Sequence, residues 1–292
     1  MKDSKSDKVV DIINYFLLVI VALLVIYPLL FVLSASLSDP RSVINGEVWL
    51  WPKGFTLDAY AKLFQNQDLI RGFVNTFKYT SVGTIINIVL TIMAAYPLSR
   101  RDFVGRNVLM AILVFTMFFS GGLIPLYLLI RDLGMLDTFW VMVIPNAVSI
   151  FNIIIMRTFF QSIPWELQEA SIIDGCSNIQ ILTKIILPLS MPVIAVMVLF
   201  YSVGHWNSYF NALIYLTDRD KFPLQLILRE ILIQSQTDEM IQSTTESIVE
   251  QQMMVEGLKY AVLIVSSLPM LILYPFLQRY FVTGLMIGSI KG

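Results

Sequence analysis

Long apolar runs constrain this chain more than any other feature of its sequence. Residues 12–33 are almost wholly apolar, and as a helix they would extend about 30 Å, the thickness of a bilayer's hydrocarbon core. Of all residues, 57% are hydrophobic and only 14% are charged, whereas a soluble domain carries about 25% charged residues. We therefore expect an integral membrane protein with a single membrane domain over residues 1–292.

The same pattern recurs along the chain and predicts an all-α fold with six transmembrane helices. A signal peptide is the alternative for the first run, because Ser34-Ala35-Ser36 resembles a cleavage site. The run is longer than the roughly 7–15 apolar residues of a signal peptide, which favours an uncleaved span. The expected spans are about 12–33, 72–98, 104–130, 138–160, 189–216 and 257–281.

Basic residues near the spans predict the orientation of the chain. Six spans place both termini on one side, and Lys and Arg in short loops favour the cytoplasm. The residues collected there are Lys2, Lys5, Lys8, Arg100, Arg101, Arg106, Arg157, Lys184, Arg279 and Lys291. The opposite side holds a similar number, mostly in the long loops 38–71 and 217–256, which count for less. We expect both termini, the loop 161–188 and the tail 282–292 in the cytoplasm, with the two long loops extracellular.

The polar loop 161–188 reads as two short helices with a sharp break. Ser162 is expected to cap the first helix, Glu166 and Glu169 suit its positive end, and Gly175 ends it in the left-handed conformation. Ser177 and Gln180 then match a capping box for the second helix. Small residues at the bend suit entry into a groove on another protein, although a plain solvated connector fits the local chemistry equally well. These small residues are Ala170, Ser171, Gly175 and Cys176.

Polar side chains inside spans are costly and are candidates for function. The densest cluster lies in the fifth expected span: Ser202, His205, Trp206, Asn207, Ser208, Tyr209 and Asn211. Aromatic rings stack on the C–H faces of sugars, and amides bond to hydroxyls, so this cluster suits a sugar pathway. Asn87 and Asn152 in other spans are further candidates. Helix packing or an interfacial belt remains the alternative reading.

Several kinds of chemistry are excluded. The sequence has no G-x-x-x-x-G-K-[ST] phosphate loop, so this chain should not hydrolyse ATP by itself. A single Cys and a single His exclude an internal disulfide and multi-histidine metal motifs. The net charge of -1 gives no reason to expect nucleic acid. We expect no cofactor, no metal and no enzymatic activity on this chain.

Short motifs resemble a known family. Glu169-Ala170-Ser171-x-x-Asp174-Gly175, with Ile186-Leu187-Pro188 and Pro192 downstream, resembles the EAA loop of bacterial ABC importer permeases. Ser171 and Cys176 stand where alanine is usual, and both are small. Residues 118–129, 206–212 and 278–288 resemble the carbohydrate, MalG-like class, and most of all its LplC/YtcP branch of oligosaccharide permeases.

The resemblance implies a type I ABC importer permease with cytoplasmic coupling helices, spanning the bacterial cell membrane many times. Implied partners are a second homologous permease, two ATPase subunits that bind ATP and Mg, an extracellular solute-binding protein at the loop 217–256, and an oligosaccharide. Implied ATPase-coupling residues are Glu166, Glu169, Ala170, Ser171, Asp174, Gly175 and Cys176. The polar side chains in the spans, chosen by their chemistry, are the expected substrate-pathway residues: Trp206, Asn207, Tyr209, Asn211, His205, Asn87 and Asn152. Implied ATPase-contacting residues of the tail are Met286, Ile287, Gly288 and Lys291.

Three other functions were weighed against this one. An ion-coupled secondary transporter needs a proton or sodium site, yet no Asp or Glu lies deep in an expected span, and Lys78 alone makes no relay. A membrane-embedded enzyme would need a paired catalytic constellation, which is absent from the sequence. An importer of amino acids or phosphate should carry Arg or Lys in the fifth-span cluster, which instead holds aromatic and amide groups.

Overall fold

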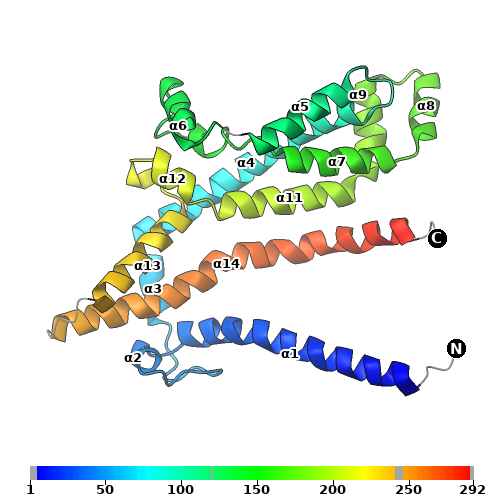
Figure 1. Cartoon of the computed structure of the whole chain (residues 1–292). Helices are drawn as coiled ribbons and strands as arrows, with labels where there is room; N and C mark the ends of the chain where they lie inside the picture. Colours follow the sequence, from blue (N-terminus) through cyan, green and yellow to red (C-terminus); the bar gives the residue numbers. More distant parts are fainter. Residues whose placement is uncertain (1–4, 120, 241–245, 290–292) are drawn as a thin grey trace. The chain divides into compact units, whose positions relative to one another are not determined.

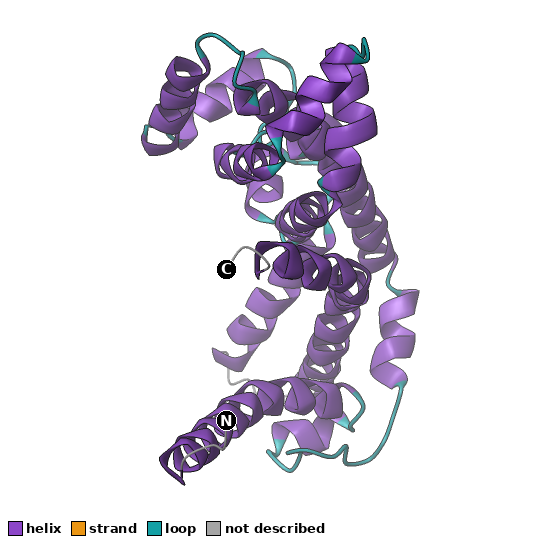
Figure 2. Ribbon diagram, turned by 90° about the vertical axis from the view of Figure 1, so that its right-hand side faces the viewer, coloured by secondary structure: helices purple, strands orange, loops and turns teal. Residues whose placement is uncertain are grey.

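The computed structural model describes residues 5–119, 121–240 and 246–289. Within these ranges all regular structure is helical (Figure 1, Figure 2), as the apolar pattern predicts. The chain divides into two compact units, one of residues 1–69 with 228–268 and the other of residues 70–227 with 269–292. Each unit is described by itself.

The first unit is built around a long apolar helix. It holds α1 (Lys5–Ser36), α2 (Pro40–Ile44), α3 (Asp58–Gln65), most of α13 (Leu224–Met240) and the first part of α14 (Glu246–Ser289). None of the most apolar stretch of α1 is buried within the chain. A helix that is hydrophobic on all sides requires an apolar surrounding, here lipid or another subunit.

Serine side chains fix the end of α1 to the loop that follows. The Ser34 hydroxyl donates to the Leu50 carbonyl at 2.6 Å, and the Ser36 and Tyr60 hydroxyls share a hydrogen bond of 2.8 Å. Ala35 between them is only 1% exposed. The three residues that resemble a cleavage site therefore lie inside a helix and are buried.

The second unit contains a bundle of helices around two apolar clusters. Its elements are α4 (Gln67–Ser99, from residue 70), α5 (Arg106–Phe118), α6 (Leu123–Asp132), η1 (Phe139–Met142), α7 (Ile150–Ser162), α8 (Trp165–Ile173), α9 (Asn178–Ile181), η2 (Leu182–Ile186), α10 (Leu187–Leu189), α11 (Met191–Trp206), α12 (Phe210–Tyr215) and η3 (Arg219–Lys221), with the last part of α14. One cluster packs the C-terminal end of α4 against α7, α9 and α11. The other packs Tyr79 of α4 against η1 and α12. In Figure 1, α7 and α11 run side by side.

Two helical segments are sharply bent, and proline or glycine lies at each bend. The helices α5 and α6 meet at 109°, and Gly122 before α6 has a φ of 85°, which favours glycine. The segment 178–189 and α11 meet at 81°, with Pro192 in the first turn of α11. By length and composition, three described helices are candidates to cross a membrane, and up to five if each bent pair is one span.

The helix expected over 138–160 is shorter than the sequence suggests. A short 3-10 helix, η1, is followed by irregular backbone, and α7 begins only at Ile150 with 13 residues. The Asn87 amide of α4 donates at 2.8 Å to the carbonyls of both Asn146 and Ala147. Non-helical backbone at membrane depth requires such partners. The buried side chain of Asn87 therefore supplies hydrogen bonds that this irregular segment needs.

Polar pairs join α4 to α11. The Thr91 and Tyr201 hydroxyls lie 2.7 Å apart, and Asn87 Oδ1 lies 2.6 Å from His205 Nε2. Hydrogen bonds of this kind hold helices together in lipid, where hydrophobic attraction between helices is absent. The close approach of α4 and α11 also requires Gly83, because a Cβ at that position would overlap the His205 ring.

The tail expected over 282–292 is helical over most of its length, because α14 continues to Ser289. The side chains of residues 279–292 and the whole of Lys291 lie outside the described part of the chain. Met286, Ile287 and Gly288 are therefore located only as positions near the end of α14.

We predict that Gly83→Ala lowers the thermal stability of the purified protein, because the new methyl group overlaps the His205 imidazole. Overpacking of this kind costs about 1–3 kcal/mol. Gly204→Ala in α11 is the matched control, since a Cβ there meets nothing within 4 Å. Alanine is the better helix former, so the control should be neutral or slightly stabilising. Equal melting temperatures for the two variants would contradict the tight α4–α11 contact.

Candidate functional site

The loop between α7 and α11 is rigid at its bend. The helix α8 ends in a Schellman motif: the Cys176 amide donates to the Ser171 carbonyl at 2.9 Å, and the Gly175 amide donates to the Ile172 carbonyl at 3.0 Å. Gly175 has a φ of 78°, as the sequence predicts. These bonds satisfy carbonyls that a helix end would otherwise leave open. The direction of α9 relative to α8 is therefore defined.

The start of α9 matches the sequence prediction, whereas the start of α8 does not. The Gln180 amide donates to Ser177 Oγ at 3.3 Å, and the Ser177 amide donates to Gln180 Oε1 at 2.8 Å, which completes the capping box. The prediction that Ser162 caps α8 is wrong. Its hydroxyl donates to the Phe159 carbonyl at 2.7 Å, in the last turn of α7. Pro164 instead precedes α8, with no side-chain cap.

The coupling residues expected from the sequence divide into an outer and an inner set. Glu166, Glu169, Ala170, Asp174 and Gly175 are exposed, whereas Ser171 is buried and Cys176 is partly buried. The Ser171 hydroxyl donates to the Leu167 carbonyl at 2.6 Å, so it faces its own helix.

Two large apolar side chains lie beside this bend and are exposed. Ile173 is 85% exposed and Ile179 is 73% exposed. They frame Gly175 on the two sides of the break. Both side chains are accessible to a partner.

Arg100, directly after α4, fixes α8 to the end of that helix. Its guanidinium makes two hydrogen bonds to the Asp102 carboxylate, at 2.8 and 2.7 Å, and one to the Tyr96 hydroxyl at 3.1 Å. It also lies over the Trp165 ring, 5.6 Å from the centroid. Because Asp102 accepts these bonds, the pKa of Arg100 is raised and the pKa of Asp102 is lowered. Arg100 thus contacts both Asp102 and Trp165, the first residue of α8.

Two further bonds complete this junction. The Tyr96 hydroxyl donates to the Asn178 carbonyl at 3.2 Å, and Trp165 Nε1 donates to Glu169 Oε1 at 2.7 Å. No sequence pattern points to Tyr96 or Trp165, and Arg100 stands out in the sequence only as a basic residue. The spacing of Arg100 and Asp102 was the one local signal for a pair.

The expected pathway residues differ widely in exposure. Trp206 is 2% exposed and packs edge-on against Phe73, Asn87 is 0% exposed and Asn152 is buried. His205 is half-buried and bonds Asn87. The more accessible pathway residues are Asn207 and Tyr209, which are exposed, and Asn211, which is half-buried. The structure thus brings Asn87 and His205 together, buries Trp206 and Asn152 separately, and leaves Asn207, Tyr209 and Asn211 more accessible.

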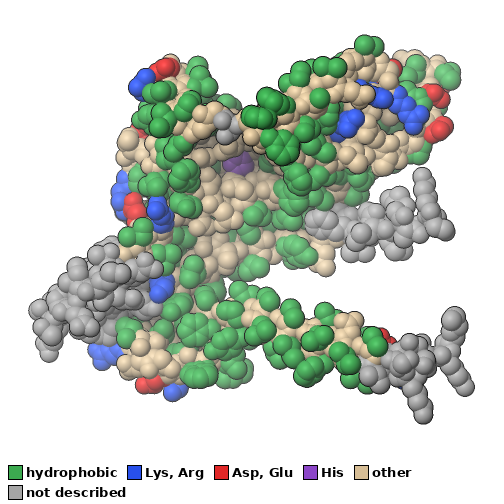
Figure 3. Space-filling model, in the orientation of Figure 1, with side chains coloured by type: hydrophobic (Ala, Val, Ile, Leu, Met, Phe, Trp, Pro, Cys, Tyr) green, Lys and Arg blue, Asp and Glu red, His purple; other side chains and the backbone are tan. Residues whose placement is uncertain are grey.

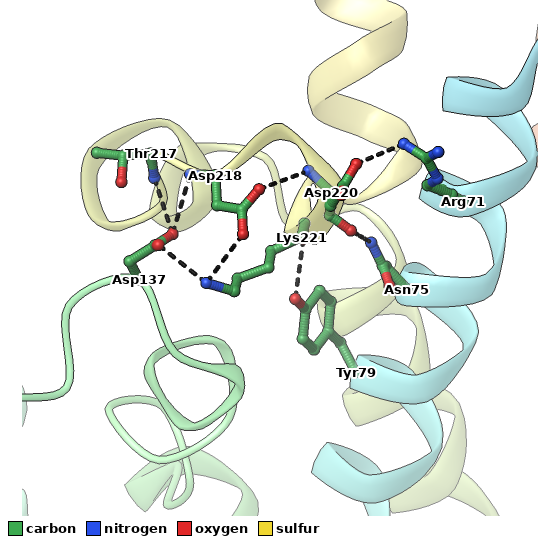
Figure 4. A network of polar contacts seen from close by, with 8 residues as sticks. All are labelled: Arg71, Asn75, Tyr79, Asp137, Thr217, Asp218, Asp220 and Lys221. Carbon is green, nitrogen blue, oxygen red and sulfur yellow. Dashed lines mark hydrogen bonds and ion pairs between the residues drawn. The ribbon is translucent and has the colours of Figure 1, made fainter.

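A polar network joins three segments at the opposite end of α4 (Figure 4). Lys221 Nζ lies 2.9 Å from the Asp137 carboxylate and 3.1 Å from that of Asp218. Asp137 also accepts the amides of Thr217 and Asp218, at 3.1 and 3.0 Å. We call Asp137, Thr217, Asp218 and Lys221 the loop clasp.

The loop clasp is anchored to α4. The Tyr79 hydroxyl donates to the Lys221 carbonyl at 2.9 Å, the Asn75 amide donates to the Asp220 carbonyl at 2.7 Å, and Arg71 pairs with the Asp220 carboxylate. Figure 4 shows all of these residues converging on η3 from α4 and from the turn after α6. Hydrogen bonds lower the pKa of Asp137 from its ordinary 3.8 to about 2, and the largest contribution comes from Lys221.

The comparison with protein families decides what kind of protein this is. Residues 1–286 match the family described as "Binding-protein-dependent transport system inner membrane component". The chain belongs to this family. Its members are the permease components of ABC importers, which are membrane proteins and not enzymes, and whose ATP is hydrolysed by separate subunits.

Relatives match the permease chain over nearly its whole length. Protein LplC of Bacillus subtilis (strain 168) is 41% identical over 292 residues, covering 100% of this chain and 98% of its own. The polygalacturonan/rhamnogalacturonan transport system permease protein YtcP of the same organism is 40% identical, covering 98% and 100%. A crystal structure of a bacterial ABC transporter involved in the import of the acidic polysaccharide alginate matches with a TM-score of 0.86 and 33% identity, covering 96% of this chain and 99% of that one. The resemblance inferred from the motifs is confirmed.

Membership in this family also decides between the functions left open by the sequence. A binding-protein-dependent permease is driven by ATP on a partner, so the ion-coupled transporter is not favoured. Lys78, the residue on which that alternative depended, is exposed on α4.

We predict that Asp137→Asn lowers the melting temperature of the permease by about 2 °C at pH 7. The pKa of Asp137 is about 2 in the folded chain and 3.8 ordinarily. The stabilisation is thus fully present above pH 3.8 and is lost as the pH falls through about 2. The difference between the two proteins should therefore persist at pH 5 and shrink toward pH 2.

Asn is chosen because Asp137 has a φ of 54°, a conformation that Asn also tolerates. Asp132→Asn is the control, since that carboxylate is exposed and pairs with its neighbour Arg131. A pH-independent difference for Asp137→Asn would show that the ion pair does not stabilise the fold.

Proposed function

We propose that this chain is one of two permease subunits of an ABC importer that moves an oligosaccharide into the cell. The observation that carries the proposal is the match, over almost the entire chain, to a permease named for polygalacturonan and rhamnogalacturonan and to an importer of alginate. The motif in residues 206–212, rich in aromatic and amide groups, agrees with a sugar substrate.

In this proposal the bend between α8 and α9 docks on an ATPase subunit. The exposed Ile173 and Ile179 supply apolar contact area, and Glu166, Glu169 and Asp174 surround them with negative charge. Ala170 and Gly175 allow close approach. The side of the membrane on which this bend lies is then the cytoplasm, and both termini lie on that side. ATP and Mg are held by the ATPase subunits.

The junction at Arg100 gives this docking a route to the membrane helices. Motion of α8 reaches α4 through the contact of Trp165 with Arg100, and motion of α9 reaches it through the bond from Tyr96 to Asn178. ATP can drive alternating access only if the loop binds the two states of the ATPase with different affinity. The rigid bend supports this, because a flexible loop would absorb the motion.

The sugar pathway is proposed along α11 and α12. Asn207, Tyr209 and Asn211 offer accessible amide and aromatic groups. Trp206, His205, Asn87 and Asn152 support the pathway from within the bundle, where they fix the helices that carry the accessible groups. The loop clasp, at the other end of α4, would then lie on the extracellular side and order the segment before α13 for the solute-binding protein. In the tail, Met286, Ile287, Gly288 and Lys291 are proposed to reach the ATPases.

The test is purification of the complex from its native membrane in mild detergent. We expect a second permease and an ATPase in stoichiometric amounts, with ATP hydrolysis that rises when sugar-loaded binding protein is added. Oligomers of galacturonate, of alginate and of neutral sugars should be compared as the loaded ligand. A chain that purifies without an ATPase, or hydrolysis that no sugar stimulates, would contradict the proposal.

Gly175→Asp should reduce uptake by about tenfold or more, because it adds a charged side chain at the centre of the docking surface. Gly134→Asp is the matched control: Gly134 has a φ of 65° and open space around it, as Gly175 does with a φ of 78°. Both variants should insert into the membrane in normal amounts. Equal loss of uptake in the two would indicate backbone strain and remove the docking role.

Asn207→Ala should weaken the stimulation of ATPase activity by sugar. The variant also removes a bond of 3.3 Å from Gln225 Nε2 to Asn207 Oδ1. Gln225→Ala removes the same bond and keeps the Asn207 amide, so it separates sugar contact from packing. If sugar stimulates the ATPase activity of both variants to the same extent, Asn207 belongs to the framework and not to the pathway.

A further inference from the structure

A cavity of about 200 Å³ lies beside α8, on the side facing the end of α4. Its walls come from the α4–α5 turn, the end of α7 and the start of α8. The lining residues that matter for its chemistry are Arg101, Arg106, Trp165 and Gln168. A water molecule takes up about 30 Å³ in the liquid, so the cavity has room for a phosphate group with a short polyol.

Two arginines line the cavity without a carboxylate partner among the described residues. Arg100 nearby is paired with Asp102, whereas in the described part of the chain Arg101 and Arg106 lie within ion-pair distance of no carboxylate. Arg106 donates to the Arg100 carbonyl at 2.9 Å, which positions its guanidinium. Arg101 lies 5.9 Å from the centroid of the Trp165 ring. Figure 3 shows basic side chains gathered over this end of the bundle, with acidic ones at its margin.

Gln168 adds an acceptor that needs a donor. Gln168 lines the cavity, the residue is only 5% exposed, and among the described residues its Oε1 has no hydrogen-bond partner. A buried acceptor without a partner is costly, and a bound donor would remove that cost. A ligand that bonds the two guanidinium groups and also donates a hydroxyl to Gln168 would satisfy all three.

We propose that this cavity binds a phosphate group that carries a neighbouring hydroxyl. Guanidinium groups match the oxygens of phosphate in a bidentate fashion, and the hydroxyl supplies the donor that Gln168 Oε1 lacks. The same chemistry occurs in the headgroup of phosphatidylglycerol and in soluble glycerol phosphate. The cavity lies where the α4 span ends, next to Ser99. Basic pockets between membrane helices at the cytoplasmic face bind anionic headgroups in this way.

In an occupied cavity the bound phosphate would lie beside Trp165, the first residue of α8. Trp165 forms part of the wall and also contacts Arg100, so the bound group would stiffen the junction between α4 and the loop. A permease with the site filled should therefore hold α8 more firmly than an empty one.

The test uses the whole purified complex, stripped of lipid and then titrated. Native mass spectrometry and thermal unfolding should be followed with phosphatidylglycerol, phosphatidylcholine and glycerol phosphate as separate additions. We expect phosphatidylglycerol or glycerol phosphate to bind and stabilise, with phosphatidylcholine at least about tenfold weaker. Stabilisation by the lipid alone identifies a headgroup as the ligand, and stabilisation by both identifies a site open to soluble phosphate. Equal binding of the two lipids, with no effect of glycerol phosphate, would overturn the proposal.

Arg101→Gln should weaken the binding of the preferred ligand by about tenfold. This arginine is exposed, so its replacement should not disturb folding. Gln168→Leu tests the hydroxyl separately and keeps both charges. Lys184→Gln is the control, because it removes an exposed positive charge that does not line the cavity. If Lys184→Gln weakens binding as much as Arg101→Gln, general surface charge explains the effect and the site is refuted. None of these measurements depends on the transported sugar, so failure here leaves the proposed importer intact.

Discussion

A hydrocarbon core offers no hydrogen-bond partner to a free backbone carbonyl, and this constraint shapes the second unit. Its helices are interrupted at Gly122, before α7 and at Ser190. The interruption before α7 is stabilised by the Asn87 amide, which bonds two carbonyls of the irregular segment and leaves its oxygen for His205. A single asparagine thus uses both of its amide hydrogens and its oxygen to join α4 to the irregular segment and to α11. The packing of α4, α7 and α11 depends on this residue.

The two ends of α4 make contacts of different kinds. At one end Arg71, Asn75 and Tyr79 hold η3 and the loop clasp through hydrogen bonds and ion pairs. At the other end Tyr96 and Arg100 hold α8 and α9 through a hydroxyl, a guanidinium and an indole ring. Both ends are polar, and the middle is held by the pairs with α11. The helix α4 is therefore held at both of its ends and along its middle.

Local features of the loop could be predicted from sequence, and distant contacts could not. Gly175 and the pair Ser177–Gln180 were predicted correctly because glycine conformation and capping depend on neighbours within a few residues. Ser162 was assigned to the wrong helix, since its hydroxyl donates to the Phe159 carbonyl in the turn before it and does not accept an amide of α8. The short α7 and the contact of Arg100 with Trp165 depend on segments far apart in the chain, which no periodicity reveals. Family motifs named the class of transporter where the local chemistry alone left alternatives.

The length of α4 has a geometric consequence. From residue 71 to residue 99 it would extend about 42 Å as a helix. A tilt of about 5° around one end would move the other by nearly 4 Å, roughly the width of a side chain. A movement of that size is enough to break or form hydrogen bonds. If coupling proceeds through α4 as proposed, even a slight tilt of this helix would change the contacts that Arg71, Asn75 and Tyr79 make with η3.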